Sequence, residues 1–371
     1  MKIDIVSFVL YSNCKTNAQS HLARARRLSF FRAARRDCPH LYNYCDKRGN
    51  LPMIKPILKS FTCMDLCQIA DSGQCFRMTE LSDMPGRFSV ISQERYLEIE
   101  QLECDWKQTD ETRFEAKTFA FYCKKEELSF WERYFDLDQD YEAYINSVRK
   151  RDSYLQHAAQ AGSGIRILNQ DPWEMILTFV ISQQKTIPKI REAVEALSRQ
   201  FGTEHRSAVL RGSQEKEITW HSFPTPSQLA EVSEETLRAL KLGYRAKYIV
   251  RLCQDAAGGR LNLDALKTMG YEEAMAYLKS FYGIGEKVAN CICLFGLHHI
   301  EAFPVDTWIE QILMQEYYRK KKKKYDALPK SRLYSEIIHD YFGMYQGYAG
   351  VMQQYIFYYE LLGKKLERCS S

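Results

Sequence analysis

The residues best suited to chemistry in this sequence are Lys287 and Asp306, which border a glycine-containing stretch. Lys287 follows Gly283-Ile-Gly285-Glu, and Asp306 follows Phe303-Pro-Val. The charged form of a lysine is disfavoured when it is partly desolvated near a helix N-terminus, and the neutral amine is a nucleophile that can form a Schiff base. An aspartate beside it can stabilise positive charge that develops on a sugar. The structural alternative is a solvated helix lysine and an aspartate that only caps a helix.

The sequence around Lys287 predicts two helices joined by a tight turn. Apolar residues recur at helical spacing up to Phe281 and again from Val288, whereas Gly283 and Gly285 interrupt the pattern. Such a turn leaves unpaired N–H groups at the start of the second helix, where the helix dipole also favours a phosphate. Because no Gly-Lys-Ser/Thr follows, a nucleic-acid backbone is favoured over a nucleoside triphosphate. We therefore expect Gly283, Gly285 and Val288 to bind nucleic-acid phosphates through backbone amides.

The run from Gly283 to Cys291, followed by Val305-Asp306, resembles the helix-hairpin-helix signature of the base-excision DNA glycosylases. Lysine at position 287 with cysteine at position 291 resembles the 8-oxoguanine DNA glycosylase/AP lyase branch of that superfamily. The resemblance implies that Lys287 displaces the damaged base at C1′ and that the resulting Schiff base breaks the strand by β-elimination. It also implies that Asp306 supports oxocarbenium-like charge, and that neither a metal nor another cofactor takes part.

The same resemblance implies a pocket for a base extruded from the duplex. The run Ser-Gly73-Gln-Cys-Phe-Arg resembles a segment in which the glycine carbonyl accepts the N7–H that 8-oxoguanine has and guanine lacks. In a second run, Phe357 would stack on the base and Gln353 would bond its Watson–Crick edge, with Cys291 on the opposite face. Taken alone, Gly73 is a turn or bulge glycine, and Gln353 and Phe357 are ordinary residues of one helix face.

Four further residues are implied to contact the DNA duplex. By position, Gln184 matches an asparagine that fills the gap left by the flipped base, and Lys189 matches an arginine that reads the opposite cytosine. Lysine lacks the bidentate fork of arginine, which weakens the expectation of a strict cytosine preference. Tyr244 is implied as a wedge against the base stack and Arg245 as a contact to the opposite base. Trp308 is a further departure, because many eukaryotic relatives carry histidine there.

Composition places few other limits on function. The chain has 371 residues and a net charge of +5, which permits a polyanionic partner without demanding one. Its 12 cysteines follow no disulfide or iron–sulfur spacing, which fits a reducing intracellular compartment, the nucleus in a eukaryote or the cytoplasm in a bacterium. No apolar run approaches the roughly 18 residues of a membrane span. We expect a monomer whose partner is damaged double-stranded DNA.

The elements that position these residues predict an α+β fold, with an N-terminal antiparallel β-sheet domain followed by an all-α helix-hairpin-helix domain. Leu97 and Ile99 alternate with acidic residues as in a strand. Asp171 and Pro172 mark the start of a buried helix. The domains we expect are a basic extension over residues 1–52, the β domain over 53–126, the helical domain over 127–365 and a tail over 366–371.

Two rival functions stay open from the sequence. A 3-methyladenine-type glycosylase for alkylated bases would use the aspartate without the lysine, so Lys287 argues against it. A non-catalytic helix-hairpin-helix DNA-binding protein would need neither Lys287 nor Asp306. The basic block over residues 319–324 is by default a solvated helix end, and a contribution to phosphate binding is the functional alternative.

Overall fold

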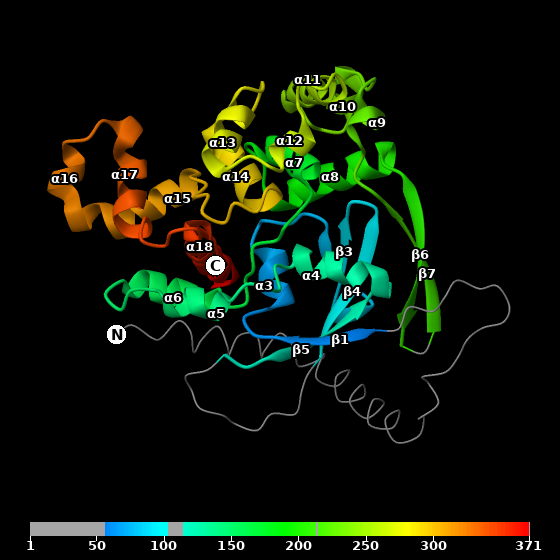
Figure 1. Cartoon of the computed structure of the whole chain (residues 1–371), viewed down its shortest axis with the longest axis horizontal. Coiled ribbons are helices and arrows are strands. Elements are labelled where there is room, and N and C mark those ends of the chain that lie inside the picture. Colours follow the sequence, from blue (N-terminus) through cyan, green and yellow to red (C-terminus); the bar gives the residue numbers. More distant parts are fainter. Residues whose placement is uncertain (1–55, 103–113, 213, 371) are drawn as a thin grey trace. The chain divides into compact units, whose positions relative to one another are not determined.

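The computed structural model of this chain describes residues 56–102, 114–212 and 214–370, with side chains described as far as Gly363 (Figure 1). The chain divides into two units, Met1–Met53 and Ile54–Ser371, and the second contains every residue described below. The predicted basic extension over residues 1–52 lies outside the described residues.

The N-terminal part of the second unit is a five-stranded antiparallel sheet, as the sequence predicts, with the strand order β1-β5-β4-β3-β2. Its elements are β1 (Ile57–Phe61), α3 (Leu66–Asp71), β2 (Met78–Leu81), β3 (Met84–Ser92), β4 (Arg95–Leu102) and β5 (Lys117–Tyr122). The register places Val90 opposite Leu97 and Ile99 opposite Phe121, and all four side chains are buried. This alternation builds one apolar face of the sheet.

Helix α4 (Leu128–Tyr134) completes the core of the sheet. Its Trp131 and Tyr134, with Phe135 just after it, are buried in the same apolar cluster as the inward face of the strands. Helix α4 therefore packs with the sheet, although our division of the chain at residue 126 assigns it to the helical domain. The position of this boundary stays a prediction.

The rest of the unit is largely helical, and no helix in its described part has both the length and the apolarity needed to cross a membrane. The helices after α4, in chain order, are α5 (Tyr141–Asn146), α6 (Ser153–Ala161), α7 (Pro172–Ser182), α8 (Ile187–Phe201), α9 (Pro226–Leu229), α10 (Glu234–Ala239), α11 (Arg245–Ala257), α12 (Leu263–Leu266), α13 (Tyr271–Lys279), α14 (Glu286–Gly296), α15 (Thr307–Ile312), η3 (Leu313–Tyr317), η4 (Tyr318–Lys321), α16 (Lys322–Asp326), α17 (Lys330–Phe342) and α18 (Ala349–Ser370).

Helix α7 is the buried centre of this helical part. Asp171 caps it by accepting a hydrogen bond from the Glu174 amide, and Pro172 occupies its first position, as predicted from the sequence. Its residues from Pro172 to Ile181 are all buried. Phe179 stacks on Phe295 of α14 with ring centroids 5.5 Å apart. A fixed α7 therefore holds α14, the helix that carries Lys287.

The α+β class is confirmed, but the helical part also contains a β-hairpin, so the prediction of an all-α domain was wrong on this point. Strands β6 (Glu204–Arg211) and β7 (Gln214–His221) pair antiparallel, drawn in green in Figure 1. The hairpin is held by distant residues, because Trp220 stacks on Tyr96 of the sheet and Arg211 bonds Glu98. Such contacts between remote segments leave no local signal in a sequence.

Candidate active site

The predicted turn between two helices is present, and it joins α13 to α14. Helix α14 begins at Glu286 with Gly285 as its N-cap. Gly283 has a φ of +94°, and a Cβ atom at this position would lie 2.6 Å from Cγ of Tyr248. Glycine is therefore required at position 283 for its backbone conformation and for its close approach to a tyrosine ring.

Lys287 lies in the first turn of α14 and is half-buried beside an aromatic ring and a thiol. Its Nζ lies 5.6 Å from the centroid of the Phe179 ring and within hydrogen-bond reach of the Cys291 thiol. Within the described residues, no carboxylate forms an ion pair with Lys287. An amine with such neighbours is held in place without being neutralised by a counter-ion.

Cys291 connects the two residues predicted to be catalytic. Burial raises the pKa of the Cys291 thiol, the charge of Lys287 opposes that effect, and the charge of Asp306 adds to it. The thiol is therefore neutral at physiological pH, and Lys287 and Asp306 both lie within electrostatic range of one atom. The position of Cys291 across a bound base from Phe357 stays a prediction.

Asp306 is the N-cap of α15, so the structural alternative describes a real feature of this residue. Its Oδ1 accepts hydrogen bonds from the amides of Trp308 at 3.0 Å and Ile309 at 2.9 Å. Both capping bonds use the same oxygen. The cap therefore fixes the orientation of the carboxylate, which is compatible with a role in charge stabilisation.

Three of the four predicted base-pocket residues come together from segments far apart in the sequence. Gly73 has a φ of +77°, and a Cβ atom there would lie 3.3 Å from Cε1 of Phe357. Gln353 is buried one helical turn before Phe357, and its Oε1 accepts a bond from Gln354 at 3.2 Å. The backbone of Gly73 thus lies against the face of α18 that carries Gln353 and Phe357.

Trp308, the position at which this sequence departs from many eukaryotic relatives, extends the aromatic surface of Phe357. The two rings stack with centroids 5.9 Å apart and an interplanar angle of 28°. Since Asp306 caps the helix that begins just before Trp308, the stack also ties the predicted catalytic carboxylate to the predicted pocket.

The predicted DNA-contacting residues fall into two groups. Gln184, Lys189 and Tyr244 are exposed, and Gln184 adopts the left-handed conformation with a φ of +51°. The ammonium group of Lys189 pairs with Glu192 at 2.9 Å. These three side chains are accessible to a duplex, and their DNA contacts stay predictions.

Arg245 is different because it is buried and already bonded to backbone carbonyls. Its Nε donates to the carbonyl of Gln183 at 2.8 Å, and its Nη1 donates to that of Leu242 at 3.3 Å. Gln183 in turn donates from Nε2 to the carbonyl of Gly283 at 3.0 Å. Arg245 and Gln183 therefore connect the loop that carries Gln184 to the turn between α13 and α14. No pattern in the sequence indicates this link. The contact between Arg245 and a base stays a prediction.

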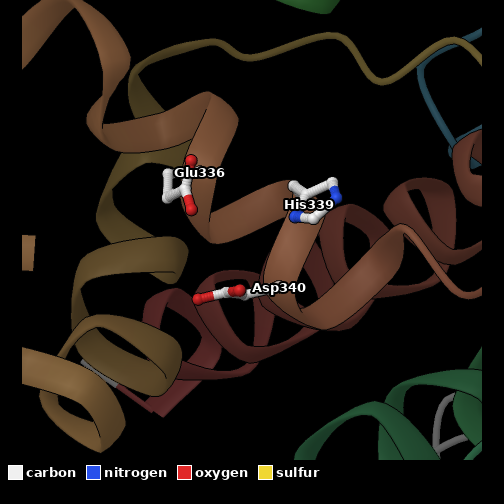
Figure 2. Close-up of side chains that lie close together, drawn as sticks. All are labelled: Glu336, His339 and Asp340. Carbon is white, nitrogen blue, oxygen red and sulfur yellow. The ribbon is translucent and has the colours of Figure 1, made fainter. Parts of the chain in front are cut away.

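One group of potential metal ligands lies elsewhere, on α17, where Glu336, His339 and Asp340 are close together (Figure 2). The two carboxylates are already paired, because Lys324 Nζ lies 2.7 Å from Glu336 and 2.8 Å from Asp340. Although burial acts to raise it, hydrogen bonds from lysines and Tyr325 lower the pKa of Asp340 to about 2. Lysines thus occupy the positions from which a cation would have to be bound. These pairs also engage part of the basic block over residues 319–324.

Comparison with known proteins places the chain in a class that fits this geometry. Residues 56–176 match the family model "8-oxoguanine DNA glycosylase, N-terminal domain", and residues 177–333 match "HhH-GPD superfamily base excision DNA repair protein". The fold and the hairpin site are therefore those of a helix-hairpin-helix base-excision repair protein.

The similar proteins narrow that class. The chain is 32% identical over 255 residues to the N-glycosylase/DNA lyase of Saccharomyces cerevisiae, covering 62% of this chain, and 33% identical over 220 residues to that of Arabidopsis thaliana, covering 58%. The aligned regions span 66% and 57% of those two proteins. The 8-oxoguanine glycosylase/lyase of Clostridium acetobutylicum in its apo-form is 31% identical, with a TM-score of 0.65, and the match covers 83% of this chain and 98% of that one. The chain belongs to the 8-oxoguanine DNA glycosylase family.

Proposed function

We propose that this protein is a bifunctional DNA glycosylase and AP lyase that removes 8-oxoguanine from duplex DNA in base-excision repair. The Clostridium relative supports the choice of substrate, because it has been solved with double-stranded DNA containing cytosine opposite 8-oxoguanine and is 28% identical with a TM-score of 0.67. The observation that carries the proposal is the position of Lys287, half-buried at a helix start beside a neutral thiol and an aromatic ring. We further propose that one copy of the chain acts on DNA in the compartment that holds the genome.

The chemistry begins with extrusion of the damaged nucleotide, because C1′ of a stacked nucleotide is not accessible. Phe357 stacks on the extruded base, Gln353 bonds its Watson–Crick edge, and the carbonyl of Gly73 accepts its N7–H. Guanine presents an acceptor at N7, so it would leave the Gly73 carbonyl unpaired. One such hydrogen bond, set against one unpaired buried acceptor, discriminates by roughly 1–3 kcal/mol.

Lys287 then acts as the nucleophile in its neutral form. Its amine bonds to C1′ as the bond between C1′ and N9 breaks, and the base leaves with the electron pair and gains a proton. The carboxylate of Asp306 stabilises the positive charge on the sugar in this step. Ring opening gives a Schiff base, removal of a C2′ proton breaks the C3′–O bond, and hydrolysis of the Schiff base releases the lysine.

Base release and strand cleavage on defined duplexes test this proposal. We expect release of free base and a cut at the lesion from a duplex with one 8-oxoguanine, and no reaction with undamaged guanine. Release of 3-methyladenine in place of 8-oxoguanine would favour the alkylated-base alternative. Tight binding to each duplex without any release would favour a non-catalytic DNA-binding protein.

A further inference from the structure

A cavity of about 610 Å³ lies beside the helical hairpin formed by α13, α14 and the turn between them, on the surface that this hairpin shares with α11. Tyr282 and Gly283 of the turn form part of its wall. Its other lining residues include four cationic side chains, which are Lys247, Arg251, Arg260 and Lys279. None of the contacts predicted from the sequence uses these four cations.

The cations outnumber the carboxylates that contact them. Arg251 and Arg260 share one buried carboxylate, Asp255, at 3.3 and 3.2 Å. Lys279 pairs with Glu286 at 2.7 Å, and this pair is open to solvent because the Glu286 side chain is 69% exposed. Lys247 is fully solvated and hydrogen-bonded to Tyr282, which raises its pKa. The cavity therefore keeps an excess of positive charge at neutral pH.

We propose that this cavity is a second phosphate-binding subsite, which continues the path of the DNA backbone beyond the amides of the hairpin. The inference rests on the proposed function, since it assigns further contacts to the same duplex. The wall formed by the hairpin turn makes the two phosphate sites adjacent, so one strand can occupy both.

The aromatic side chains beside the cavity favour a nucleic acid over a small anion. Tyr282 is 53% exposed and packs edge-on against Tyr248, which also contacts Tyr244. Lys247 Nζ lies 5.4 and 5.6 Å from the centroids of the Tyr248 and Tyr282 rings. Cations interleaved with exposed rings are typical of nucleic-acid-binding surfaces, in which the charges follow the phosphates and the rings contact the bases, whereas a small anion would use only the charges.

The test is the salt dependence of DNA binding by the double variant R251Q/K279Q. Both side chains are about half-exposed, and Arg260 still pairs with Asp255 in this variant, so the fold is retained. The matched control is R206Q/K124Q, which removes two exposed cations that are also paired with carboxylates but lie on other elements. Affinity for a long duplex containing 8-oxoguanine is measured by fluorescence anisotropy over a series of KCl concentrations.

We expect the double variant to bind on the order of tenfold more weakly at low salt, with a log–log salt slope shallower by about 0.9 for each phosphate that the variant no longer neutralises. The control should keep the wild-type slope. When the duplex is shortened stepwise from each end, the difference between wild type and double variant should vanish for shortening at one end only.

An unchanged slope would overturn the subsite, and so would a weakened affinity that persists on the shortest duplex that wild type binds. Base release by the wild-type protein separates this inference from the proposed function. If wild type releases 8-oxoguanine and the slopes are equal, only the subsite fails. If wild type releases no base and the slope still becomes shallower, the subsite stands and the proposed chemistry fails.

Discussion

Glu98 and Lys287 are both ionisable side chains withdrawn from water, yet their surroundings differ. Glu98 is fully buried, and its carboxylate lies 2.7 Å from Arg87 and 2.6 Å from Arg211, while the Tyr96 hydroxyl donates to it at 2.9 Å. Lys287 has the Cys291 thiol and the Phe179 ring as neighbours, and in the described part of the chain it has no ion-pair partner.

The difference separates an ionisable group that holds the structure together from one that is available to react. Two arginines from different parts of the chain neutralise Glu98, so its carboxylate joins the sheet to the β6–β7 hairpin. In the described residues, Lys287 has no comparable ion pair that its amine would have to leave before it bonds to a substrate. We therefore expect substitutions at Glu98 to change stability and substitutions at Lys287 and Asp306 to change activity.

The largest effect on stability is expected from Glu98→Gln. This change leaves the buried Arg87 without its counter-charge and leaves Arg211 with only the exposed Asp83, which should lower the free energy of unfolding by about 3–5 kcal/mol in urea denaturation. Glu217→Gln is the matched control, because its exposed pair with Arg206 should contribute less than about 1 kcal/mol. For Glu98→Gln, a change as small as the one in the control would show that the buried pair is not structural.

Asp306→Asn should separate capping from catalysis. Asparagine caps a helix about as well as aspartate, so the melting temperature should be nearly unchanged. Removal of the negative charge should reduce the single-turnover rate of base release about 10²–10³-fold. If Asp306→Asn keeps the wild-type rate, Asp306 acts only as an N-cap.

Glu174 is an intermediate case, since it is a buried carboxylate whose pKa burial raises to about 8. Arg77, whose charge opposes this effect, is itself bonded to Glu195 and to the carbonyl of His221. Because folding raises the pKa of Glu174, its protonated side chain makes its full contribution to the free energy of unfolding below about pH 4.5. This contribution falls as the pH rises toward 8. Glu174→Gln should therefore flatten the decrease in unfolding free energy across this pH range. An identical pH profile for wild type and variant would contradict a raised pKa.

Gly73→Ala is expected to have the smallest of these effects. An added Cβ would press on the Phe357 ring, so we expect base release from 8-oxoguanine to slow about tenfold, which corresponds to about 1.4 kcal/mol. Gly86→Ala is the control, since Gly86 has a similar φ of +83° with nothing near the added Cβ. Equal rates for both variants would mean that backbone strain, and not the pocket, accounts for the effect.

The sequence predicts best those features that depend on neighbouring residues. The turn at Gly283, the start of α14 at Glu286 and the cap at Asp306 all follow from residue types within a few positions. The meeting of Gly73 with Phe357 required the family resemblance, because no local pattern indicates contacts between segments so far apart.

Features built from distant partners were not predicted. The β6–β7 hairpin depends on Trp220 and Arg211 contacting the sheet, and the bond from Gln183 to Gly283 spans 100 residues. The sequence pattern places Glu98 in the polar half of a strand alternation, and its burial becomes evident only with the two arginines that surround it.

The measurement that tests the central claim most directly is borohydride trapping on a duplex with one 8-oxoguanine, followed by identification of the modified peptide. We predict a covalent protein–DNA adduct in wild type, with the attachment at Lys287, and no adduct in Lys287→Gln. An adduct at another residue, or base release by wild type without any adduct, would contradict the assignment of Lys287 as the Schiff-base nucleophile.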